Sequence, residues 1–434
     1  MAVTSYAGTL RYLYGLQYRG MKFGLRNIRS LLADAGNPER AFASIHIAGT
    51  NGKGSTAAFL ASILREAGCR TGLYTSPHLV RFTERIRIDG REMAERRLVE
   101  YVRILRPAIE RTKATFFEAT TCVAFLYFAD EGVDAAVIET GLGGRLDATN
   151  VVTPLLSIIT NVSLDHTDYL GTTIRAIARE KGGIIKAGVP VLTATLDPAV
   201  VDVLHRIAEQ RGTRLFRSLD LTRMTAARDG RRVRFEGRGF KVPLCVPGLP
   251  GEYQHENAAL AVSAVQILRR SQRLLRTYPG LTAPAVLRGL ARVRVHTGLQ
   301  GRFQMIRDGA RYLVDVAHNP AGIRTLAAEV LRMKHGPRIA VFGVMKDKDY
   351  REMLQVLAGI VETIVAVAPS LRRALPARAL YREAEKRGIT VVFGGSVDRG
   401  LAVARRLAGR SPILVTGSHF VAGEALRGIR GETA

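Results

Sequence analysis

Short apolar runs alternate with helical stretches along almost the whole chain of 434 residues. The runs Phe42–Ala48, Ala135–Ile138, Leu155–Thr160 and Val189–Thr193 are rich in Val, Ile, Leu and Ala and are bounded by Gly, Pro or Asn. Continuous apolar strands separated by helices are typical of a parallel sheet that is covered on both faces. The sequence therefore predicts an α/β fold, in which ligands bind at the carboxyl ends of the strands.

The same alternation divides the chain into two predicted domains. Between 221 and 246 apolar and polar residues alternate around an Asp-Gly turn, which predicts a small antiparallel insert. A second series of strands and helices follows the stretch 294–300, which lacks strong periodicity. We expect doubly wound domains at 1–293 and 301–434, joined by a linker at 294–300.

The charge is unusual, because 64 basic and 38 acidic residues give a formal net charge of +26. Such a value raises the alternative of a P-loop protein that binds nucleic acid. The basic residues are nevertheless spread through both predicted domains and form no polybasic tail. The chain has no Trp and only 6% aromatic residues, so it lacks a platform on which bases stack. We therefore expect an arginine-rich surface and no nucleic-acid partner.

Cysteine usage and hydropathy bear on the cellular compartment. The three cysteines are widely separated and show no metal-ligand spacing, which favours a reducing compartment without structural zinc. The first 20 residues contain no signal-peptide core, and no apolar run reaches the roughly 18 residues that a membrane helix needs. We expect a cytoplasmic protein, monomeric and without a membrane partner.

The strongest local signal is a glycine-rich turn between the first strand and the first predicted helix of the sheet. Backbone N–H groups and a helix N-terminus there would face an anion, and Lys53 would add a point charge. Gly54 separates this lysine from the following Ser, so the spacing departs from the strict Walker pattern. A turn without function is the alternative, which the flanking strand and helix disfavour. The predicted nucleotide contacts are Gly49, Thr50, Asn51, Gly52, Lys53, Gly54 and Ser55.

This loop resembles the nucleotide loop of the Mur ligase superfamily, and its flanks resemble the folylpolyglutamate synthase and dihydrofolate synthase family. The resemblance implies a P-loop-containing, Mur-ligase-like central domain and a smaller Rossmann-like, glutamate-ligase domain. The blocks that carry it run in order along the chain: Tyr74–Leu79 with Glu84–Ile86, Thr115–Glu118, Glu139–Asn150, Leu164–His166, Glu180–Lys186, Gly301–Gln304 and Asp315–Pro320.

The activity implied by the resemblance is an ATP-dependent, ADP-forming ligase of folate metabolism. It would join L-glutamate to a pteroate or folate carboxylate through an acyl phosphate, acting on dihydropteroate and on tetrahydrofolate. Two alternatives stay open, a folylpolyglutamate synthase only and a Mur-type ligase with another carboxylate acceptor.

The resemblance implies two Mg²⁺ ions, with Ser76, Glu139 and His166 as metal contacts. Glu139 follows a buried strand, and its hard oxygen suits Mg²⁺, which keeps only one or two protein ligands beside nucleotide phosphates. The alternatives are a salt bridge for Glu139, local hydrogen bonds for His166 and a plain turn for Ser76. With Lys53, we expect Glu139, His166 and Lys181 to be the catalytic residues.

Lys181 lies near the end of a helical pattern, just before two glycines. The resemblance places it at the lysine that carries a carbamate (N6-carboxylysine) in this superfamily. That modification reverses the sign of the side chain's charge, so that it could help to hold the second metal. The alternative is an unmodified lysine that interacts favourably with the helix C-terminus.

The resemblance also assigns residues to ATP outside the loop. It places Asn257 at the base, Arg302 at the phosphates, Asp315 at the ribose hydroxyls and His318 in the same cleft. The alternatives are a helix N-cap for Asn257, a surface ion pair for Arg302 and a turn carboxylate for Asp315.

For the pterin acceptor, the resemblance implies a pocket in which Phe117 offers a ring for stacking. Plain core packing is the alternative for this ring and its neighbour. We expect 21–24 to close the pocket. Residues 347–349 with 417–418 follow strands of the second domain and are candidates to contact the incoming amino acid, with a solvated charged loop as the alternative. The predicted acceptor contacts are Thr115, Phe116, Phe117, Glu118, Leu146, Asp147 and Ala148.

Overall fold

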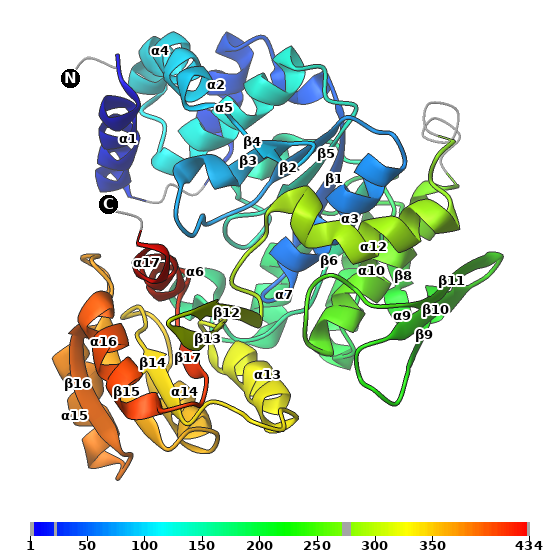
Figure 1. The fold of residues 1–434 in the computed structure, drawn as a ribbon. Coiled ribbons are helices and arrows are strands. Elements are labelled where there is room, and N and C mark those ends of the chain that lie inside the picture. Colours follow the sequence, from blue (N-terminus) through cyan, green and yellow to red (C-terminus); the bar gives the residue numbers. More distant parts are fainter. Residues whose placement is uncertain (1–3, 21–23, 271–278, 432–434) are drawn as a thin grey trace. The chain divides into compact units, whose positions relative to one another are not determined.

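The structure, a computed structural model, describes residues 4–20, 24–270 and 279–431. It divides into two compact units, and Figure 1 shows helices on both faces of the main sheet in each of them. The predicted α/β fold is therefore confirmed. The first unit comprises Met1–Pro77, Thr83–Gly248 and Gln254–Gly298, and the second comprises His78–Phe82, Leu249–Tyr253 and Leu299–Ala434.

The first unit is built on an eight-stranded sheet of order β4-β3-β2-β5-β1-β6-β7-β8. The pairs from β2 to β8 are parallel, and β3 and β4 add an antiparallel edge. The four predicted strands became β1, β5, β6 and β7. The bounds are β1 Ala43–Ala48, β2 Thr71–Tyr74, β3 Ile86–Ile88, β4 Arg91–Glu92, β5 Ala135–Glu139, β6 Leu156–Ile159, β7 Val191–Thr193 and β8 Leu215–Arg217.

Helix α3 (Lys53–Glu66), which follows β1, is buried almost all round. It lies between the sheet and α12 (Ala283–Thr297), so both of its faces are covered (Figure 1). Ser62 Oγ donates to the carbonyl oxygen of Gly289 at 2.6 Å, which joins the two helices without a buried unpaired hydroxyl. Each fully buried Leu or Ile side chain contributes roughly 1.5–3 kcal/mol to stability, so this double-sided burial makes α3 a rigid support.

The other helices of the first unit cover the remaining sheet surface and the two ends of the sheet (Figure 1). Their bounds are α1 Tyr6–Gly15, α2 Arg26–Asp34, α4 Glu95–Thr112, α5 Phe116–Asp130, α6 Thr167–Leu170, α7 Ile174–Gly182, α8 Pro198–Gln210, α9 Ser218–Leu221 and α10 Tyr253–Leu268, with the 3-10 turns η1 Leu16–Arg19, η2 Pro38–Arg40, η3 Phe82–Arg85 (which begins in the second unit) and η4 Ala148–Val151.

The linker prediction differs from the structure at its beginning. Helix α12 continues through Thr297, because Val286, Leu290, Val293 and Thr297 keep a buried helical spacing. Residues 294–297 are therefore helical. The predicted antiparallel insert is confirmed as a three-stranded sheet of order β11-β10-β9. Its strands are β9 Arg223–Ala226, β10 Val233–Gly237 and β11 Phe240–Cys245.

The second unit contains a six-stranded sheet of order β12-β13-β17-β14-β15-β16. Alternate residues of one strand enter different cores, since Ile339 and Val341 pack against α16 and α17, whereas Ala340 and Phe342 pack against α13, α14 and α15. Only β12 is antiparallel. The bounds are β12 Gln304–Asp308, β13 Ala310–Val314, β14 Ile339–Phe342, β15 Thr363–Ala368, β16 Val391–Ser396, β17 Ile413–Thr416, α13 Pro320–Leu331, α14 Tyr350–Ala358, α15 Ala377–Lys386, α16 Val397–Ala408 and α17 His419–Arg430.

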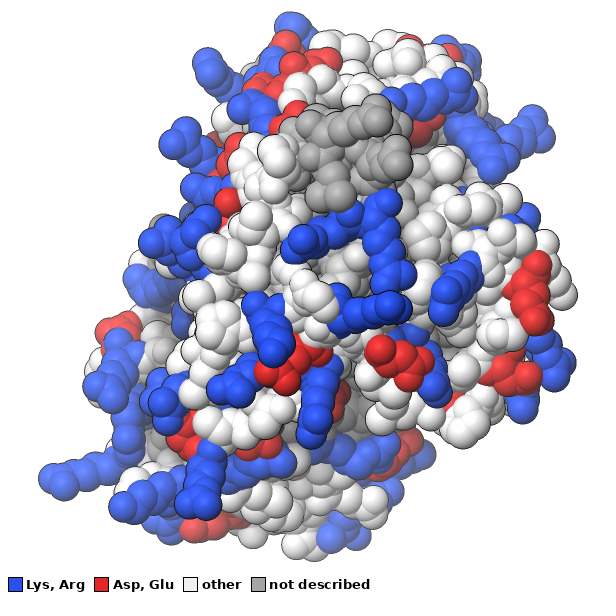
Figure 2. All heavy atoms as spheres, turned by 90° about the vertical axis from the view of Figure 1, so that its right-hand side faces the viewer, with Lys and Arg blue, Asp and Glu red and all other residues white. Residues whose placement is uncertain are grey.

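Charged side chains are dispersed over the surface that Figure 2 presents, with Lys and Arg spread widely and Asp and Glu between them. Several arginines form exposed ion pairs, such as Arg338 with Glu362 at 2.6 Å. Exposed pairs of this kind contribute roughly 0–1 kcal/mol each. Within the described ranges, no helix is both long and apolar enough to cross a membrane.

Candidate active site

The phosphate loop begins immediately after β1, at a position where only glycine fits. Gly49 has a φ of 153°, and a Cβ atom there would lie 1.8 Å from Oγ1 of Thr160. The loop ends at Lys53, where α3 begins. The predicted strand–loop–helix arrangement is therefore present, with free N–H groups of the first turn of α3 available to an anion.

The segment after β6 holds the phosphate loop through several hydrogen bonds. The N–H groups of Thr50 and Asn51 donate to the backbone and side-chain oxygens of Asn161 at 2.8 and 2.9 Å. Thr160 Oγ1 donates to the Asn51 carbonyl at 2.6 Å, and Ser163 N–H donates to Thr50 Oγ1 at 3.0 Å. Our sequence reading did not identify Thr160, Asn161 and Ser163, although polar residues directly after an apolar strand were an available signal.

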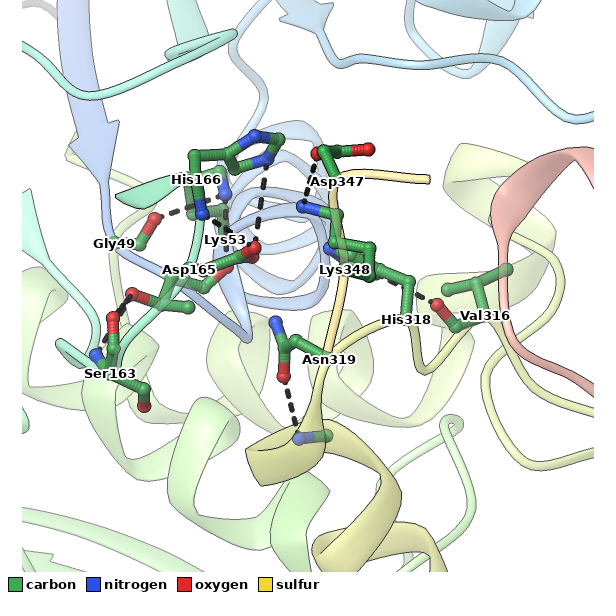
Figure 3. A network of polar contacts seen from close by, with 12 residues as sticks. Gly49, Lys53, Ser163, Asp165, His166, Val316, His318, Asn319, Asp347 and Lys348 are labelled. Carbon is green, nitrogen blue, oxygen red and sulfur yellow. Dashed lines mark hydrogen bonds and ion pairs between the residues drawn. The ribbon is translucent and has the colours of Figure 1, made fainter. Parts of the chain in front are cut away.

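Two lysines converge on one carbonyl oxygen of this loop. Lys53 Nζ lies 3.1 Å from the Gly49 oxygen, and Lys181 Nζ lies 2.8 Å from the same atom. Lys181 is buried at the end of α7, and Figure 3 shows Lys53 bonded to Gly49. Because both Nζ atoms contact the same oxygen, they are at most about 6 Å apart, and two ammonium charges at that separation repel by roughly 3 kcal/mol at an effective dielectric constant of about 20. A negative group on one of these lysines would replace this repulsion with attraction.

The predicted metal contacts Ser76 and Glu139 lie together. Glu139 is buried at the end of β5, and its Oε2 accepts the backbone N–H of Ser76 at 3.2 Å. The two residues meet because β2 and β5 are parallel neighbours in register at Tyr74 and Ile138. A carboxylate beside a serine fits Mg²⁺, which needs few protein ligands when phosphates supply the others.

His166 lies on a different loop, at the start of α6. Its φ of 51° is in the left-handed region, which is uncommon outside glycine and is found at functional sites. Its ring Nε2 lies 3.9 Å from Asp165 Oδ1 (Figure 3). The described residues contain no group of three or more His, Cys, Asp and Glu side chains that could hold a metal ion. The proximity of His166 to Glu139 therefore stays a prediction.

The start of α5 carries a buried carboxylate, that of Glu118, of which only one oxygen has a hydrogen-bond partner. Thr115 and Glu118 form a capping box, in which Thr115 N–H donates to Glu118 Oε2 at 2.8 Å and Glu118 N–H donates to Thr115 Oγ1 at 3.3 Å. The other oxygen, Glu118 Oε1, is buried and has no hydrogen-bond partner. A buried unpaired acceptor costs about 1–3 kcal/mol, so this oxygen is suited to accept an N–H group from a ligand.

Aromatic rings surround this end of α5. Tyr14 stacks on Phe116 with centroids 5.6 Å apart, and the buried Arg85 guanidinium lies 5.4 Å from the centre of the same ring. Phe117 stacks on Tyr74 at 6.2 Å. The sequence analysis named both phenylalanines as acceptor contacts, whereas it included Arg85 in a matching block without assigning it a role. Residues 21–23, which we expected to close the pocket, lie outside the described residues.

Asp147 anchors the loop that follows β5. Its Oδ2 accepts the N–H groups of Gly141 and Leu142, both at 2.8 Å, and its Oδ1 accepts the N–H and the hydroxyl of Thr149. Burial raises the pKa of Asp147, and these hydrogen bonds oppose that rise. A carboxylate has about four acceptor positions, and all four are used inside the chain. The substrate contact predicted for Asp147, with Leu146 and Ala148 beside it, stays a prediction.

Asn257 lies next to the beginning of α3. Thr56 Oγ1 donates to its side-chain oxygen at 3.4 Å, and its Nδ2 donates to Gln254 at 3.0 Å. Because α10 begins at Tyr253, the alternative that Asn257 caps this helix is wrong. The side chain lies against the phosphate loop instead, since a Cβ atom on Gly52 would be 2.4 Å from its Oδ1.

In the second unit, Asp315 follows β13 and is buried. It accepts hydrogen bonds from Phe303 N–H at 2.8 Å, Ala317 N–H at 2.8 Å and the Tyr253 hydroxyl at 3.2 Å. Burial raises the pKa of Asp315, while the Arg302 charge and the hydrogen bonds oppose the rise. The predicted pair Arg302 and Asp315 therefore shares one local environment. Our sequence reading did not foresee the role of Tyr253.

Other polar groups lie at the same edge of this sheet, after β13, β14 and β17. His318 Nδ1 donates to the Val316 carbonyl at 3.0 Å, and the His318 ring lies 5.2 Å from that of His419. The buried Lys348 Nζ lies 3.4 Å from Asp347 Oδ2, as Figure 3 shows. The carboxyl ends of parallel strands are where α/β folds bind ligands.

Comparisons with known proteins place both halves of the chain in one superfamily. The Mur ligase middle domain matches residues 47–265, and the Mur ligase glutamate ligase domain matches residues 301–419. The chain is 34% identical to a folylpolyglutamate synthase of Lacticaseibacillus casei, over 96% of this chain and 97% of the relative. It is 35% identical to a dihydrofolate synthase/folylpolyglutamate synthase of Bacillus subtilis, over 88% and 89%.

Solved structures agree with these relatives over the whole length. Escherichia coli FolC in complex with DHPP and ADP has a TM-score of 0.87 and 29% identity, with 99% of each chain covered. A bifunctional folylpolyglutamate synthase/dihydrofolate synthase of Yersinia pestis, complexed with AMPPNP and Mn, has a TM-score of 0.84 and 28% identity, with 99% of each chain covered. The chain belongs to the folylpolyglutamate synthase/dihydrofolate synthase family of the Mur ligase superfamily, whose members are ATP-dependent, ADP-forming ligases.

Proposed function

We propose that this ligase is bifunctional and adds L-glutamate both to dihydropteroate and to tetrahydrofolate. The observation that carries the proposal is the buried, unpaired Oε1 of Glu118 beside the rings of Phe116 and Phe117. A flat heteroaromatic ring with N–H donors suits such a pocket, since it offers both stacking surface and hydrogen bonds. The Bacillus subtilis relative is named for both activities, and the Lacticaseibacillus casei relative for the second.

In the proposed reaction, an oxygen of the acceptor carboxylate attacks the γ-phosphorus of ATP, and ADP leaves. The amine of L-glutamate then attacks the carbonyl carbon of the acyl phosphate, a proton is lost from nitrogen, and phosphate leaves. Lys53 exchanges its bonds to the loop carbonyls for phosphate oxygens, and the first N–H groups of α3 stabilise the transferred charge. Positioning supplies most of the acceleration, because the protein performs no covalent step.

Divalent metal binding is supported by the relative that was solved with manganese. Here Glu139, Ser76 and His166 would hold Mg²⁺, in two sites. When bound, the metal neutralises charge on the phosphate oxygens during transfer. The hydrogen bond from Ser76 N–H to Glu139 Oε2 restrains the orientation of this carboxylate.

We propose further that Lys181 is carbamylated. After losing one proton, its neutral Nζ would attack the carbon of CO₂, forming an N–C bond and releasing a second proton. The resulting anion would face Lys53, which removes the repulsion between two ammonium groups at the Gly49 oxygen. Lys181→Ala should lose activity and regain part of it with a short carboxylic acid, whereas the exposed Lys241→Ala should be unaffected. Full activity of Lys181→Ala without added acid would contradict the carbamate.

The remaining nucleotide contacts belong to the same proposal. Asn257 would bind the adenine edge with its amide, which both donates and accepts. In the second unit Asp315 would bind the ribose hydroxyls, Arg302 and His318 would bind phosphate oxygens, and the Asp347–Lys348 pair with Ser418 would bind the incoming amino acid. Each assignment predicts a raised KM for one substrate when the side chain is truncated.

Glutamate-dependent ADP release with dihydropteroate and with tetrahydrofolate tests the function. Turnover with both acceptors is expected, and turnover with tetrahydrofolate alone would identify a folylpolyglutamate synthase only. If both acceptors fail and another carboxylate works, the folate assignment is wrong. We also propose that the protein is cytoplasmic and monomeric. Sedimentation at several concentrations tests the monomeric state. Because the charges on the face shown in Figure 2 are dispersed, we expect that nucleic acid does not stimulate ADP release.

A further inference from the structure

A buried histidine on the central strand is unused by the chemistry described so far. His46 lies in β1, between β5 and β6, and is fully buried. Its Nε2 lies 2.8 Å from Oγ1 of Thr149, which is also fully buried. Thr149 Oγ1 in turn bonds to Asp147, the anchor of the loop after β5. Three side chains therefore form a continuous polar chain through the core of the first unit.

The direction of the protons along this chain follows from the groups themselves. An ionised carboxylate only accepts, so Thr149 uses its single proton to donate to Asp147. The hydroxyl oxygen is then free to accept, and His46 must donate to it from Nε2. The proton on His46 is therefore at Nε2, and Nδ1 is a bare acceptor, which is buried without a hydrogen-bond partner.

The electrostatic surroundings keep the imidazole in this form. Burial and, to a smaller extent, the positive charge of the nearby Lys186 together lower the pKa of His46 to about 3. Lys186 itself donates to the Asn150 carbonyl at 2.8 Å, which holds its charge near η4. A neutral imidazole with a fixed tautomer is thus present throughout the physiological pH range.

We propose that His46 and Thr149 are positioning residues for the loop after β5, which carries the proposed acceptor contacts Leu146, Asp147 and Ala148. Together they orient the Asp147 carboxylate, whose other oxygen holds the N–H groups of Gly141 and Leu142. These amides lie two and three residues after Glu139 in the sequence. The chain of hydrogen bonds therefore connects β1, which leads to the phosphate loop, with the loop that follows the proposed metal contact Glu139.

The loop has little room to move without disturbing the acceptor pocket. A Cβ atom on Gly141 would lie 2.5 Å from the tip of the Phe117 ring, so the backbone of the loop closes directly on that ring. A displacement of a few tenths of an ångström there would shift Phe117, which stacks on Tyr74. Retaining a buried imidazole with one unpaired nitrogen costs stability, whereas an apolar side chain would pack without that cost. The positioning role explains why a polar residue occupies position 46.

Matched substitutions separate the hydrogen bonds from the packing. Thr149→Val keeps the shape but removes the donor to Asp147, and Thr149→Ser keeps the hydroxyl. His46→Met fills similar volume without a donor, and His46→Gln places an amide N–H near the position of Nε2. The double variant Thr149→Val with His46→Met tests whether both residues act through one chain.

We expect the acceptor KM to rise about tenfold in Thr149→Val and in His46→Met, which corresponds to the loss of about one buried hydrogen bond. The affinity for nucleotide should stay within about twofold, because the phosphate loop is held by other residues. The Ser and Gln variants should resemble the parent, and the double variant should be no worse than the poorer single variant. An equal loss of nucleotide affinity, or an unchanged acceptor KM, would overturn the proposal.

The activity readout rests on the proposed function, so a second measurement is independent of it. Amide hydrogen exchange at Gly141 and Leu142 should be faster in Thr149→Val than in Thr149→Ser, in the absence of any substrate. Equal exchange in these two variants would overturn the positioning role even if catalysis had changed. If the parent turned over neither folate acceptor, the functional proposal would fail, and hydrogen exchange would still decide the structural one.

Discussion

Two loops follow neighbouring parallel strands of the first unit, and they are held in opposite ways. The phosphate loop after β1 is held from outside, by backbone and side-chain groups of residues 160–163. In the loop after β5, Arg145 and Asn150 bond to Glu180 and Gly183. The N–H groups of Gly141 and Leu142 at the beginning of this loop, however, are held from within, by the single carboxylate of Asp147. The first arrangement is redundant and the second is concentrated in one residue. The difference determines which single substitutions each loop tolerates.

The largest effect is expected at Gly49, because the several hydrogen bonds that hold the phosphate loop cannot compensate for a steric clash there. Gly49→Ala places a Cβ 1.8 Å from Thr160 Oγ1 and 3.2 Å from the Thr160 nitrogen, so the clash displaces the segment that holds the loop. We expect a cost of at least about 4 kcal/mol and a loss of roughly a thousandfold in ATP-dependent turnover. Calorimetric titration with ATP measures the accompanying loss of nucleotide affinity.

The control is Gly188→Ala, which has a similarly unfavourable φ of 68° but no atom within 4 Å of the new Cβ. It should cost only about 1 kcal/mol and leave ATP binding unchanged. Normal ATP affinity in Gly49→Ala would show that the loop adapts more easily than its close contact with Thr160 implies.

The next effect tests the concentrated anchor. Asp147→Asn replaces one acceptor oxygen with an N–H₂ group, which must face either the amides of Gly141 and Leu142 or the donors of Thr149. Buried donors are then unpaired, at a cost of about 3 kcal/mol in total. We expect a roughly hundredfold fall in kcat/KM for the acceptor and a far smaller change for ATP.

The exposed Asp220→Asn, which removes only a surface pair with Arg217, serves as the control for this substitution. It should be silent in the same assay, since exposed pairs contribute little. If Asp147→Asn affected ATP and acceptor equally, the two loops would be supported as one unit.

Acid should lower the free energy of unfolding of the first unit through His46, which lies in β1. His46 is neutral in the folded protein down to about pH 3, because burial lowers its pKa, whereas the unfolded side chain is protonated below about pH 6.5. Below pH 6.5 the unfolded state binds the extra proton, so the free energy of unfolding falls by about 1.4 kcal/mol per pH unit, or about 2 kcal/mol by pH 5. Above pH 6.5, His46 does not make the free energy of unfolding depend on pH.

Urea unfolding at pH 7 and pH 5 measures the effect, with His46→Met as the comparison. The parent should lose about 2 kcal/mol more than the variant between these pH values, since other titrating groups are common to both. Equal losses would mean that His46 is protonated in the folded protein, and the proton direction assigned to the Thr149 bond would then be wrong.

The same contrast explains what could be predicted from the sequence. The phosphate loop is a local pattern in which glycines, a lysine and a following helix are contiguous, so its conformation follows from residues 49–56 alone. The strands of the central sheet were equally local, since burial on both faces requires continuous apolar runs. The antiparallel edges β3, β4 and β12 are short or half-polar, and their strand state depends on pairing with partners distant in sequence.

The supports of the site could not be predicted in that way. Thr160 and Asn161 act on residues more than 100 positions earlier, and His46 acts on Thr149 at a similar separation. Tyr253 reaches Asp315 only once the second unit has folded. Such contacts depend on sheet order, which the sequence pattern leaves open. Arg85 was assigned no role, because in the sequence a buried guanidinium on an aromatic ring cannot be distinguished from the other arginines of this arginine-rich chain.

The smallest effect is expected where the redundancy of the phosphate loop is tested one bond at a time. Thr160→Val keeps the volume of the side chain and removes its 2.6 Å bond to the Asn51 carbonyl, while both N–H bonds to Asn161 remain. Asn51 is only partly buried, so water can replace the lost donor, and we expect a cost of about 1 kcal/mol. The KM for ATP should rise no more than about fivefold, with Thr160→Ser close to the parent. A loss as large as that of Asp147→Asn would mean that both loops depend on a single anchor, and the contrast between them would disappear.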